Sequence, residues 1–210
     1  MPSILCRCGL GDYMSKDWTG NHKSIYTTLG ASSHSDYDRV KNDFYSTDPK
    51  AINHLLRFEK FDNNIWECAC GNGNLSKRLE RFGYNVTSTD LVYRGFGEGQ
   101  IDFLKCYEKF DGDIITNPPY KYATEFVLKA LELSKRKVAM FLKIQFLESQ
   151  KRWLKLFKDF PPSTIYVFVK RISCYRNDDR SIKGSAVCYA WFVWDKEYDG
   201  ETRVRWIDNL

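Results

Sequence analysis

Strand-like and helix-like patterns alternate along this chain from Asp48 onward, and this alternation restricts the fold more than any other feature. Short apolar runs rich in β-branched residues predict strands, and longer segments with helical spacing of apolar residues lie between them. The predicted strands are 64–69, 85–89, 111–117 and 137–144, and the predicted helices are 49–58, 75–82, 121–135 and 146–158. Strands that alternate with helices predict a mainly parallel α/β sheet with helices on both faces.

The C-terminal part departs from this alternation. Residues 163–170 and 186–194 are both rich in β-forming residues, and only a polar, charged loop, Ser173 to Ser185, lies between them. Two strands that are joined without a helix pair most simply as antiparallel neighbours. We therefore expect a C-terminal antiparallel hairpin at one edge of the sheet.

Composition narrows the class of protein. No apolar run approaches the roughly 20 residues that a membrane span needs, and the first residues lack the pattern of a signal peptide, so we expect a cytoplasmic protein without a membrane partner. Seven cysteines, an odd and scattered number, are typical of reduced thiols. Their spacing and that of the histidines predict no metal site. Residues 1–40 show no sustained pattern and are predicted to be a loosely structured arm, followed by one domain, 41–210.

The predicted strand 111–117 ends in Asn117-Pro118-Pro119-Tyr120. Proline has no N–H for a strand ladder and holds the preceding residue in an extended conformation, so the strand must end at Asn117 in a stiff loop. That loop follows the carboxyl end of a strand, which is where open α/β sheets bind their ligands.

A second loop points to a nucleoside. The turn after strand 64–69 contains Gly71 and Gly73, and Asp90 follows the next strand. Glycines at such a turn let the backbone approach a ligand, and an acidic residue at the next strand end is placed to accept hydrogen bonds from ribose hydroxyls. Ser76 stands where the dinucleotide fingerprint requires a third glycine, so a pyrophosphate site is disfavoured.

Three segments, in this order, resemble the S-adenosylmethionine-dependent methyltransferases, and among them the N6-adenine class that acts on nucleic acids. They are Phe44-Tyr-Ser-Thr-Asp-Pro49, Glu67-Cys-Ala-Cys-Gly-Asn-Gly73 and Asn117-Pro-Pro-Tyr120. The chain also looks like small phage or prophage adenine methylases that share Asn42-Asp-Phe-Tyr45. The resemblance covers residues 40 to about 195 and implies a Rossmann-like class I methyltransferase fold with a seven-stranded sheet.

The resemblance also implies roles for individual residues. The catalytic residues would be Asn117, Pro118, Pro119 and Tyr120. The residues that bind the cofactor S-adenosylmethionine would be Tyr45, Thr47, Glu67, Ala69, Gly71, Gly73, Asp90, Leu91, Asp102, Phe103 and Asn117.

A chemical argument supports the role of the catalytic loop. The exocyclic nitrogen of adenine is a poor nucleophile because its lone pair is delocalised into the ring. Two acceptors, the Asn117 side-chain oxygen and the Pro118 carbonyl, would hold the two amino protons and direct the lone pair at the sulfonium methyl. Tyr120 would stack on a base that has left the duplex.

The substrate side is less defined by sequence. Lys170, Arg171 and Tyr175 are the candidate substrate-binding residues, and a net charge of +5 permits contact with a polyanion. DNA is the expected partner, with RNA as an alternative. No segment is long enough for a target-recognition domain, so recognition is expected from the N-terminal arm, the 173–185 loop, a partner subunit or a second copy in a homodimer. Alternatively the chain has no sequence recognition at all, and single-stranded or structured nucleic acid is then one candidate substrate beside duplex DNA.

Two other functions stay open on the sequence. The same loop also suits a methyltransferase that acts on RNA or on a protein glutamine, because a carboxamide is likewise a planar group with two amide protons. A module that binds S-adenosylmethionine or nucleic acid without catalysis is the other alternative.

Overall fold

The structure, a computed structural model, describes residues 45–176 and 187–210. The arm predicted for residues 1–40 and most of the predicted substrate loop lie outside these residues. No helix in the two described ranges is long and apolar enough to cross a membrane.

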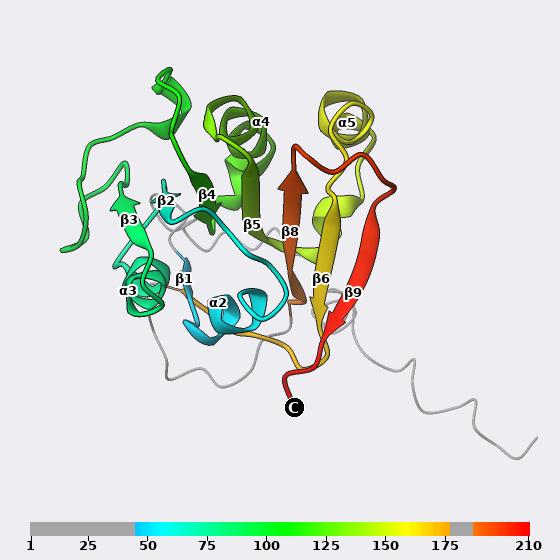
Figure 1. Cartoon of the computed structure of the whole chain (residues 1–210), viewed down its shortest axis with the longest axis horizontal. Helices are drawn as coiled ribbons and strands as arrows, with labels where there is room; N and C mark the ends of the chain where they lie inside the picture. The colour runs from blue at the N-terminus through cyan, green and yellow to red at the C-terminus, as the bar shows by residue number, and fades with distance from the viewer. Residues whose placement is uncertain (1–44, 177–186) are drawn as a thin grey trace, which may run out of the picture. The chain divides into compact units, whose positions relative to one another are not determined.

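The described residues form a seven-stranded sheet in the order β3-β2-β4-β5-β8-β6-β9 (Figure 1). Strands β3, β2, β4 and β5 run parallel, β8 is antiparallel to both of its neighbours, and β9 is parallel to β6. Their bounds are β2 Asn64–Glu67, β3 Asn85–Ser88, β4 Asp113–Thr116, β5 Lys137–Lys143, β6 Thr164–Phe168, β8 Tyr189–Asp195 and β9 Arg203–Ile207. This mostly parallel sheet confirms the predicted Rossmann-like fold class.

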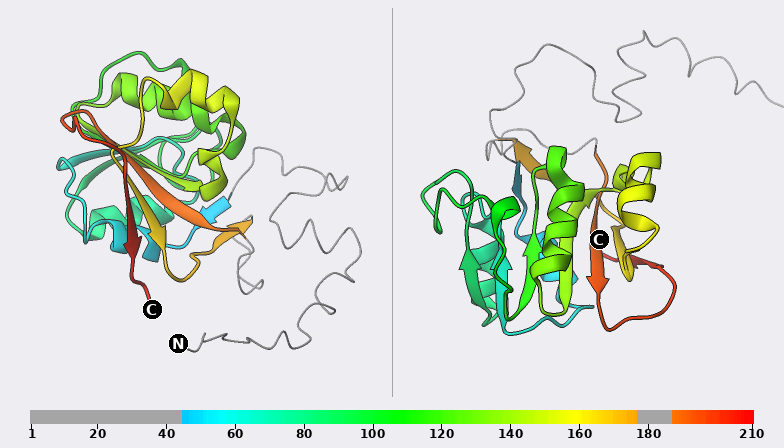
Figure 2. Two further views of the ribbon diagram at one scale, coloured as in Figure 1. Left: turned by 90° about the vertical axis from the view of Figure 1, so that its right-hand side faces the viewer. Right: turned by 90° about the horizontal axis from the view of Figure 1, so that it is seen from above.

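Helices cover both faces of the sheet, as the alternation predicts (Figure 2). On one face α2 (Lys50–Leu55) and α3 (Asn74–Arg81) bury Ile52 and Leu79 against Ile115 and Phe141 of the strands. On the other face pack α4 (Ala123–Leu133), α5 (Gln150–Arg152) and the π-helical turn η4 (Trp153–Phe157). Three short 3-10 turns, η1 Phe103–Lys105, η2 Tyr120–Tyr122 and η3 Ile144–Leu147, complete the connections.

The central strands are buried along almost their whole length. All four residues of β4 and the first six of both β5 and β8 are buried. Near-continuous apolar runs of this kind, rather than alternating ones, are typical of strands that are covered on both faces. Because β2, β3, β4 and β5 run parallel, their carboxyl ends lie on the same side of the sheet. The predicted loops emerge on that side.

The predicted antiparallel pairing of the two C-terminal strands is confirmed, but their predicted position at the edge of the sheet was wrong. β6 and β8 pair antiparallel, but β8 lies between β5 and β6 rather than at the edge, and β9 adds a further strand outside β6. At the edge of the sheet a strand as apolar as β8 would leave its backbone N–H and C=O groups unpaired on one side. With a neighbouring strand on each side, these groups are paired. The sequence reading stopped at Trp194 and so missed β9, whose first four residues are exposed and whose last, Ile207, is buried.

The helix predicted for 146–158 is instead three short turns, η3, α5 and η4. The Ser149 side chain accepts from the backbone N–H of Arg152 at 3.4 Å and so starts a new helix. The wider π-helical turn that follows buries the adjacent Leu156 and Phe157. Trp153 and Leu154, which the pattern placed with Phe157 on the apolar face, are 56% and 59% exposed.

Candidate active site

The Asn-Pro-Pro-Tyr loop leaves the sheet where the sequence predicts. β4 ends at Thr116, and the chain turns through the two prolines into η2 and then α4. Pro118 is buried, and the extended ψ of 120° at Pro119 directs the chain away from the strand. The loop is thus fixed at both ends, by a central strand and by a helix.

Asn117 is held by residues about seventy positions earlier in the chain. Its Nδ2 donates to the backbone oxygen of Tyr45 at 3.0 Å and to Thr47 Oγ1 at 2.8 Å. Its Oδ1 is buried and has no hydrogen-bond partner among the described residues. A buried acceptor without a partner is destabilising by about 1–3 kcal/mol, so it identifies a position that is suited to a donor from outside the chain.

The partners of Asn117 belong to a small second sheet. β1 (Tyr45–Thr47) pairs antiparallel with β7 (Cys174–Arg176), with Thr47 opposite Cys174. The backbone N–H of Asp48 donates to Ser173 O at 3.2 Å, and Asp48 Oδ1 accepts from Lys50 N at 2.9 Å at the start of α2. The segment 44–49, which contributes Tyr45 and Thr47, therefore meets the Asn-Pro-Pro-Tyr loop at Asn117.

Tyr120 is enclosed on several sides. Its ring centroid lies 5.5 Å from that of Tyr45 and 5.9 Å from that of Tyr189, and the Lys143 ammonium lies 4.9 Å from the ring centroid. Its hydroxyl donates to Cys174 Sγ at 3.6 Å. Burial raises the pKa of Tyr120 well above its usual value, so the ring stays a neutral apolar surface at physiological pH.

The glycine turn after β2 is linked directly to Asp90. Gly71 and Gly73 both have positive φ, 56° and 79°. Asp90 Oδ2 accepts from the backbone N–H of Gly71 at 2.9 Å, and its Oδ1 accepts from Val92 N at 2.9 Å. The turn and the acidic residue, predicted from separate strands, thus form one structure at the carboxyl ends of β2 and β3.

Gly73 has a structural reason to be glycine besides any approach of a ligand. A Cβ at this position would lie 2.3 Å from the ring of Phe96. The positive φ adds a backbone penalty for any other residue. Both constraints arise from the chain itself, so the presence of glycine at this position is not by itself evidence of a bound ligand.

Glu67 lies beneath this turn. It is buried, and Ser76 of α3 donates a hydrogen bond to its Oε2, while Ser88 of β3 donates to Ser76 Oγ at 2.7 Å. Burial raises the pKa of the Glu67 carboxyl to about 8, so it holds its proton at neutral pH. In these contacts Glu67 joins β2, α3 and β3 at the base of the glycine turn, and Ala69 lies half-buried beside it.

The other predicted cofactor residues follow the next segment. Asp102 accepts from Leu104 N at 3.2 Å and pairs with Lys105 at 3.4 Å. The Phe103 ring is buried in the core, 5.1 Å from the ring centroids of both Trp66 and Phe126. This ring therefore packs into the core, and only the backbone of Phe103 is left to face a ligand. Leu91 is 58% exposed.

The predicted substrate residues lie beyond β6, which ends on the same side as β4 and β5. Lys170 and Arg171 are both exposed, and Lys170 N donates to Asn209 Oδ1 at 2.8 Å. Tyr175 lies in β7, paired with Ser46 of β1. This strand joins the predicted substrate segment to the partners of Asn117.

Comparison with solved structures then decides the fold. The chain superposes on a candidate class I S-adenosylmethionine-dependent methyltransferase from Listeria monocytogenes, with a TM-score of 0.56, 12% identity, and coverage of 86% of this chain and 70% of that one. The fold is that of class I methyltransferases. A candidate RNA methyltransferase from Pyrococcus horikoshii matches with a TM-score of 0.50 and 15% identity, over 83% of this chain and 98% of that one.

Similarity at this level concerns the fold alone. A candidate hemolysin from Lactococcus lactis also matches, with a TM-score of 0.50 and 12% identity, over 75% of this chain and 91% of that one. No family model matches the sequence, and no curated protein sequence is detectably similar to it. The chemistry must therefore be argued from the site that this class I methyltransferase fold carries.

Sequence reasoning missed three residues that surround Tyr120: Lys143, Cys174 and Tyr189. Lys143 is the last residue of β5 and pairs with Tyr189, the first of β8. A charged residue at the carboxyl end of a predicted buried strand is the signal that could have identified Lys143. Nothing in the local pattern places Cys174 or Tyr189 beside the loop, because their position depends on the pairing of distant strands.

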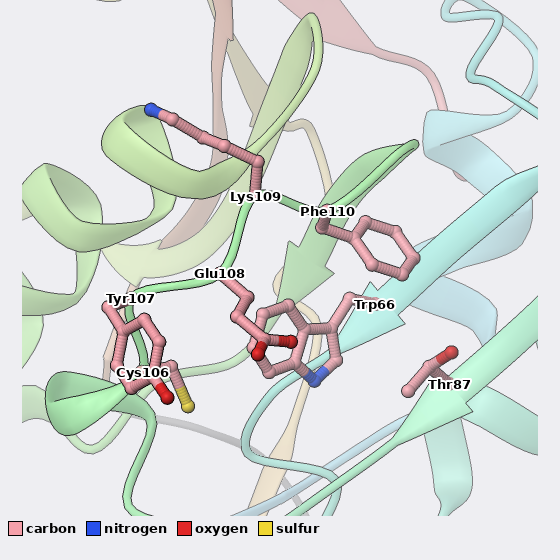
Figure 3. Close-up of a pocket in the computed structure, with 7 residues that line it drawn as sticks. All are labelled: Trp66, Thr87, Cys106, Tyr107, Glu108, Lys109 and Phe110. Carbon is pink, nitrogen blue, oxygen red and sulfur yellow. The ribbon is translucent and has the colours of Figure 1, made fainter.

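Two cavities in the described part of this methyltransferase fold bear on the site. One, of about 310 Å³, lies over β2 and β3 near the sheet edge, with Glu108 directed toward the Trp66 indole and Lys109 directed away (Figure 3). None of the predicted site residues lines it. The second, of about 160 Å³, adjoins the Asn-Pro-Pro-Tyr loop and is lined by Tyr120, Ala123, Leu142, Lys143, Gln145, Phe146 and Arg152. No group of three potential metal ligands gathers within the described ranges.

Proposed function

We propose that this chain transfers a methyl group from S-adenosylmethionine to the exocyclic N6 amine of an adenine in nucleic acid. The observation that carries the proposal is the state of Asn117, whose Nδ2 is fixed by two hydrogen bonds and whose buried Oδ1 has no partner in the described chain. An amino group that donates to this oxygen would satisfy it.

The reaction needs positioning rather than a strong base. The Asn117 Oδ1 and the Pro118 carbonyl would each accept a hydrogen bond from one N–H of the amine, and this orients the lone pair of the nitrogen for attack. The bond from nitrogen to the methyl carbon forms as the bond from sulfur to carbon breaks, so the sulfonium becomes a neutral thioether. The methylated nitrogen then loses one proton to water. The two acceptors stabilise the positive charge that develops on the nitrogen.

The residues at the strand ends fit the cofactor. Asp90 is already oriented toward the glycine turn by its bond to Gly71 N, and each carboxylate oxygen has a second lone pair for a ribose hydroxyl. Thr47 and Tyr45 lie next to Asn117, where the reactive end of the cofactor is expected. S-adenosylmethionine supplies a methyl group on a positively charged sulfur, and the chain supplies the orientation.

Nucleic acid is the polymer that these features favour. The net charge is +5, and Lys143, Lys170 and Arg171 all lie at the edge of the sheet from which the catalytic loop emerges. The loop resembles that of adenine methyltransferases that act on DNA, and the similarity to a candidate RNA methyltransferase makes RNA the second polymer to test.

One experiment tests the reaction and the polymer together. Purified protein and labelled S-adenosylmethionine are incubated with duplex DNA, single-stranded DNA, RNA and cell-protein extract, and the digested nucleosides and peptides are analysed by mass. The proposal predicts N6-methyladenine, and the best substrate identifies the polymer. If label appears only in protein glutamine, the substrate is a carboxamide and the adenine proposal is wrong. If the cofactor binds but no methyl group is transferred, the chain is a binding module.

A further inference from the structure

The smaller cavity beside Tyr120 is built like a site for one flat ring. Two of its lining residues, Tyr120 and Phe146, are aromatic, and two more, Ala123 and Leu142, are aliphatic. Its volume of about 160 Å³ is well below the roughly 300 Å³ at which pockets for whole drug-sized ligands begin. A single base fits this size better than a complete nucleoside cofactor.

Polar groups surround this apolar lining. The Lys143 ammonium lies over the Tyr120 ring, and no carboxylate of the described residues lies within ion-pair distance of it. Gln145 is exposed, and its side-chain amide has no hydrogen bond with the described chain. A cation and a free amide therefore face the cavity, and both are available to a ligand.

The third polar residue, Arg152, is held in place. Its Nε donates to Phe146 O at 2.7 Å and its Nη2 to Gln145 O at 3.1 Å, and its guanidinium carbon lies 5.0 Å from the centroid of the Phe146 ring. These bonds fix the short turn that carries Gln145 and Phe146. The cavity is therefore pre-formed, which reduces the conformational entropy that binding would otherwise remove.

The cavity is distinct from the place where the amine is held. Neither Asn117 nor Pro118 lines it, and Tyr120 is the one residue that belongs both to the cavity and to the catalytic loop. A base that is held at Asn117 and stacked on Tyr120 leaves the cavity free for a neighbouring base. Stacking on aromatic rings binds any base, whereas an amide distinguishes bases by their hydrogen-bonding edges.

We propose that this cavity binds the base next to the target adenine in the same strand, with Gln145 reading its edge and Lys143 attracting the adjacent phosphate. This inference rests on the proposed function, because it assumes that nucleic acid is the substrate. It gives a chain without a dedicated recognition domain a means to prefer one neighbouring base.

The test measures binding, so that it does not depend on the reaction. Short fluorescent single-stranded oligonucleotides contain one adenine, and the bases on either side of it are varied. Their dissociation constants are measured by anisotropy without S-adenosylmethionine, with the wild-type protein and with its Gln145→Ala, Gln150→Ala, Lys143→Met and Lys143→Arg variants. Gln150 is the matched control because it is an exposed glutamine nearby in the chain that does not line the cavity.

The inference predicts that affinity varies with the base at one flanking position by roughly 5- to 100-fold, the range expected for one good base-edge contact. Gln145→Ala removes this difference, and Gln150→Ala retains it. Lys143→Met weakens all the oligonucleotides by a similar factor, and Lys143→Arg restores most of the loss. A preference that survives Gln145→Ala, or equal binding of every oligonucleotide, overturns the inference. Oligonucleotide binding with this preference but without N6-methyladenine from the wild type would refute the proposed reaction and leave the cavity assignment standing.

Discussion

At the scale of single residues, the sequence predicts where the Asn-Pro-Pro-Tyr loop leaves the sheet but not which distant residues surround it. The two prolines require the strand to end no later than Asn117, and β4 ends at Thr116, one residue earlier. That Asn117 Oδ1 has no partner within residues 45–176 and 187–210 could not be predicted, because Tyr45 and Thr47 fix the orientation of the amide through its Nδ2, and β1, which carries them, pairs with the distant β7. The residue types in a segment show which hydrogen-bonding groups are present. Pairing between strands that are distant in the sequence decides which of these groups already have a partner.

Glu67 gives a prediction at this scale. Its pKa is raised from 4.5 to about 8 in the folded protein, so the folded state holds a proton that the unfolded state releases between these values. The contribution of Glu67 to stability should therefore be fully present below about pH 4.5 and should fall by up to about 1.4 kcal/mol per pH unit as the pH rises toward 8. Glu67→Gln keeps an acceptor for Ser76 and cannot ionise. Urea unfolding should show that the free energy of unfolding falls more between pH 5 and pH 8 in the wild type than in the variant. Equal losses would mean that Glu67 is not the group that ionises.

At the scale of elements, the parallel half of the sheet is predictable and the C-terminal half is not. A strand followed by a helix and a further strand has one strongly preferred connection, so alternation alone predicts that β2, β3, β4 and β5 run parallel, although it does not predict their order in the sheet. No such rule locates β8 between β5 and β6, and β9 is a short, mostly exposed strand that shows only a weak pattern. The break of the predicted 146–158 helix at Ser149 likewise follows from local capping that helical spacing does not detect.

Strand β9 gives a prediction at the scale of elements. Ile207 is fully buried at its end, whereas Val204 in the same strand is 49% exposed. Ile207→Ala should lower the free energy of unfolding by about 2–5 kcal/mol, because it removes buried methyl groups and leaves a cavity. Val204→Ala is the matched control and should cost about 1 kcal/mol or less. Chemical denaturation measures both, and similar losses would mean that β9 does not close the core.

At the scale of the whole molecule, the strand ends form one continuous edge with the glycine turn, Asp90 and the catalytic loop. A ligand that contacts several of these segments should stabilise the fold as a unit. Excess S-adenosylmethionine at 100 times its dissociation constant should add about 2.7 kcal/mol to stability, seen as a higher melting temperature. Asp90→Ala should lose this shift, because it removes the acceptors for the ribose. A shift that persists in Asp90→Ala would exclude this residue from the cofactor site.

The central claim is that Asn117 holds the amine of the target, and its most direct test is the rate of methyl transfer by Asn117→Ala. Loss of one positioned hydrogen-bonding group in an active site lowers turnover by about 10²–10³-fold, so we expect a loss of at least this size in N6-methyladenine formed per unit time. The thermal shift with S-adenosylmethionine serves as the control and should persist, because Asp90 and the glycine turn are unchanged. Transfer at the wild-type rate with the cofactor bound would contradict the account.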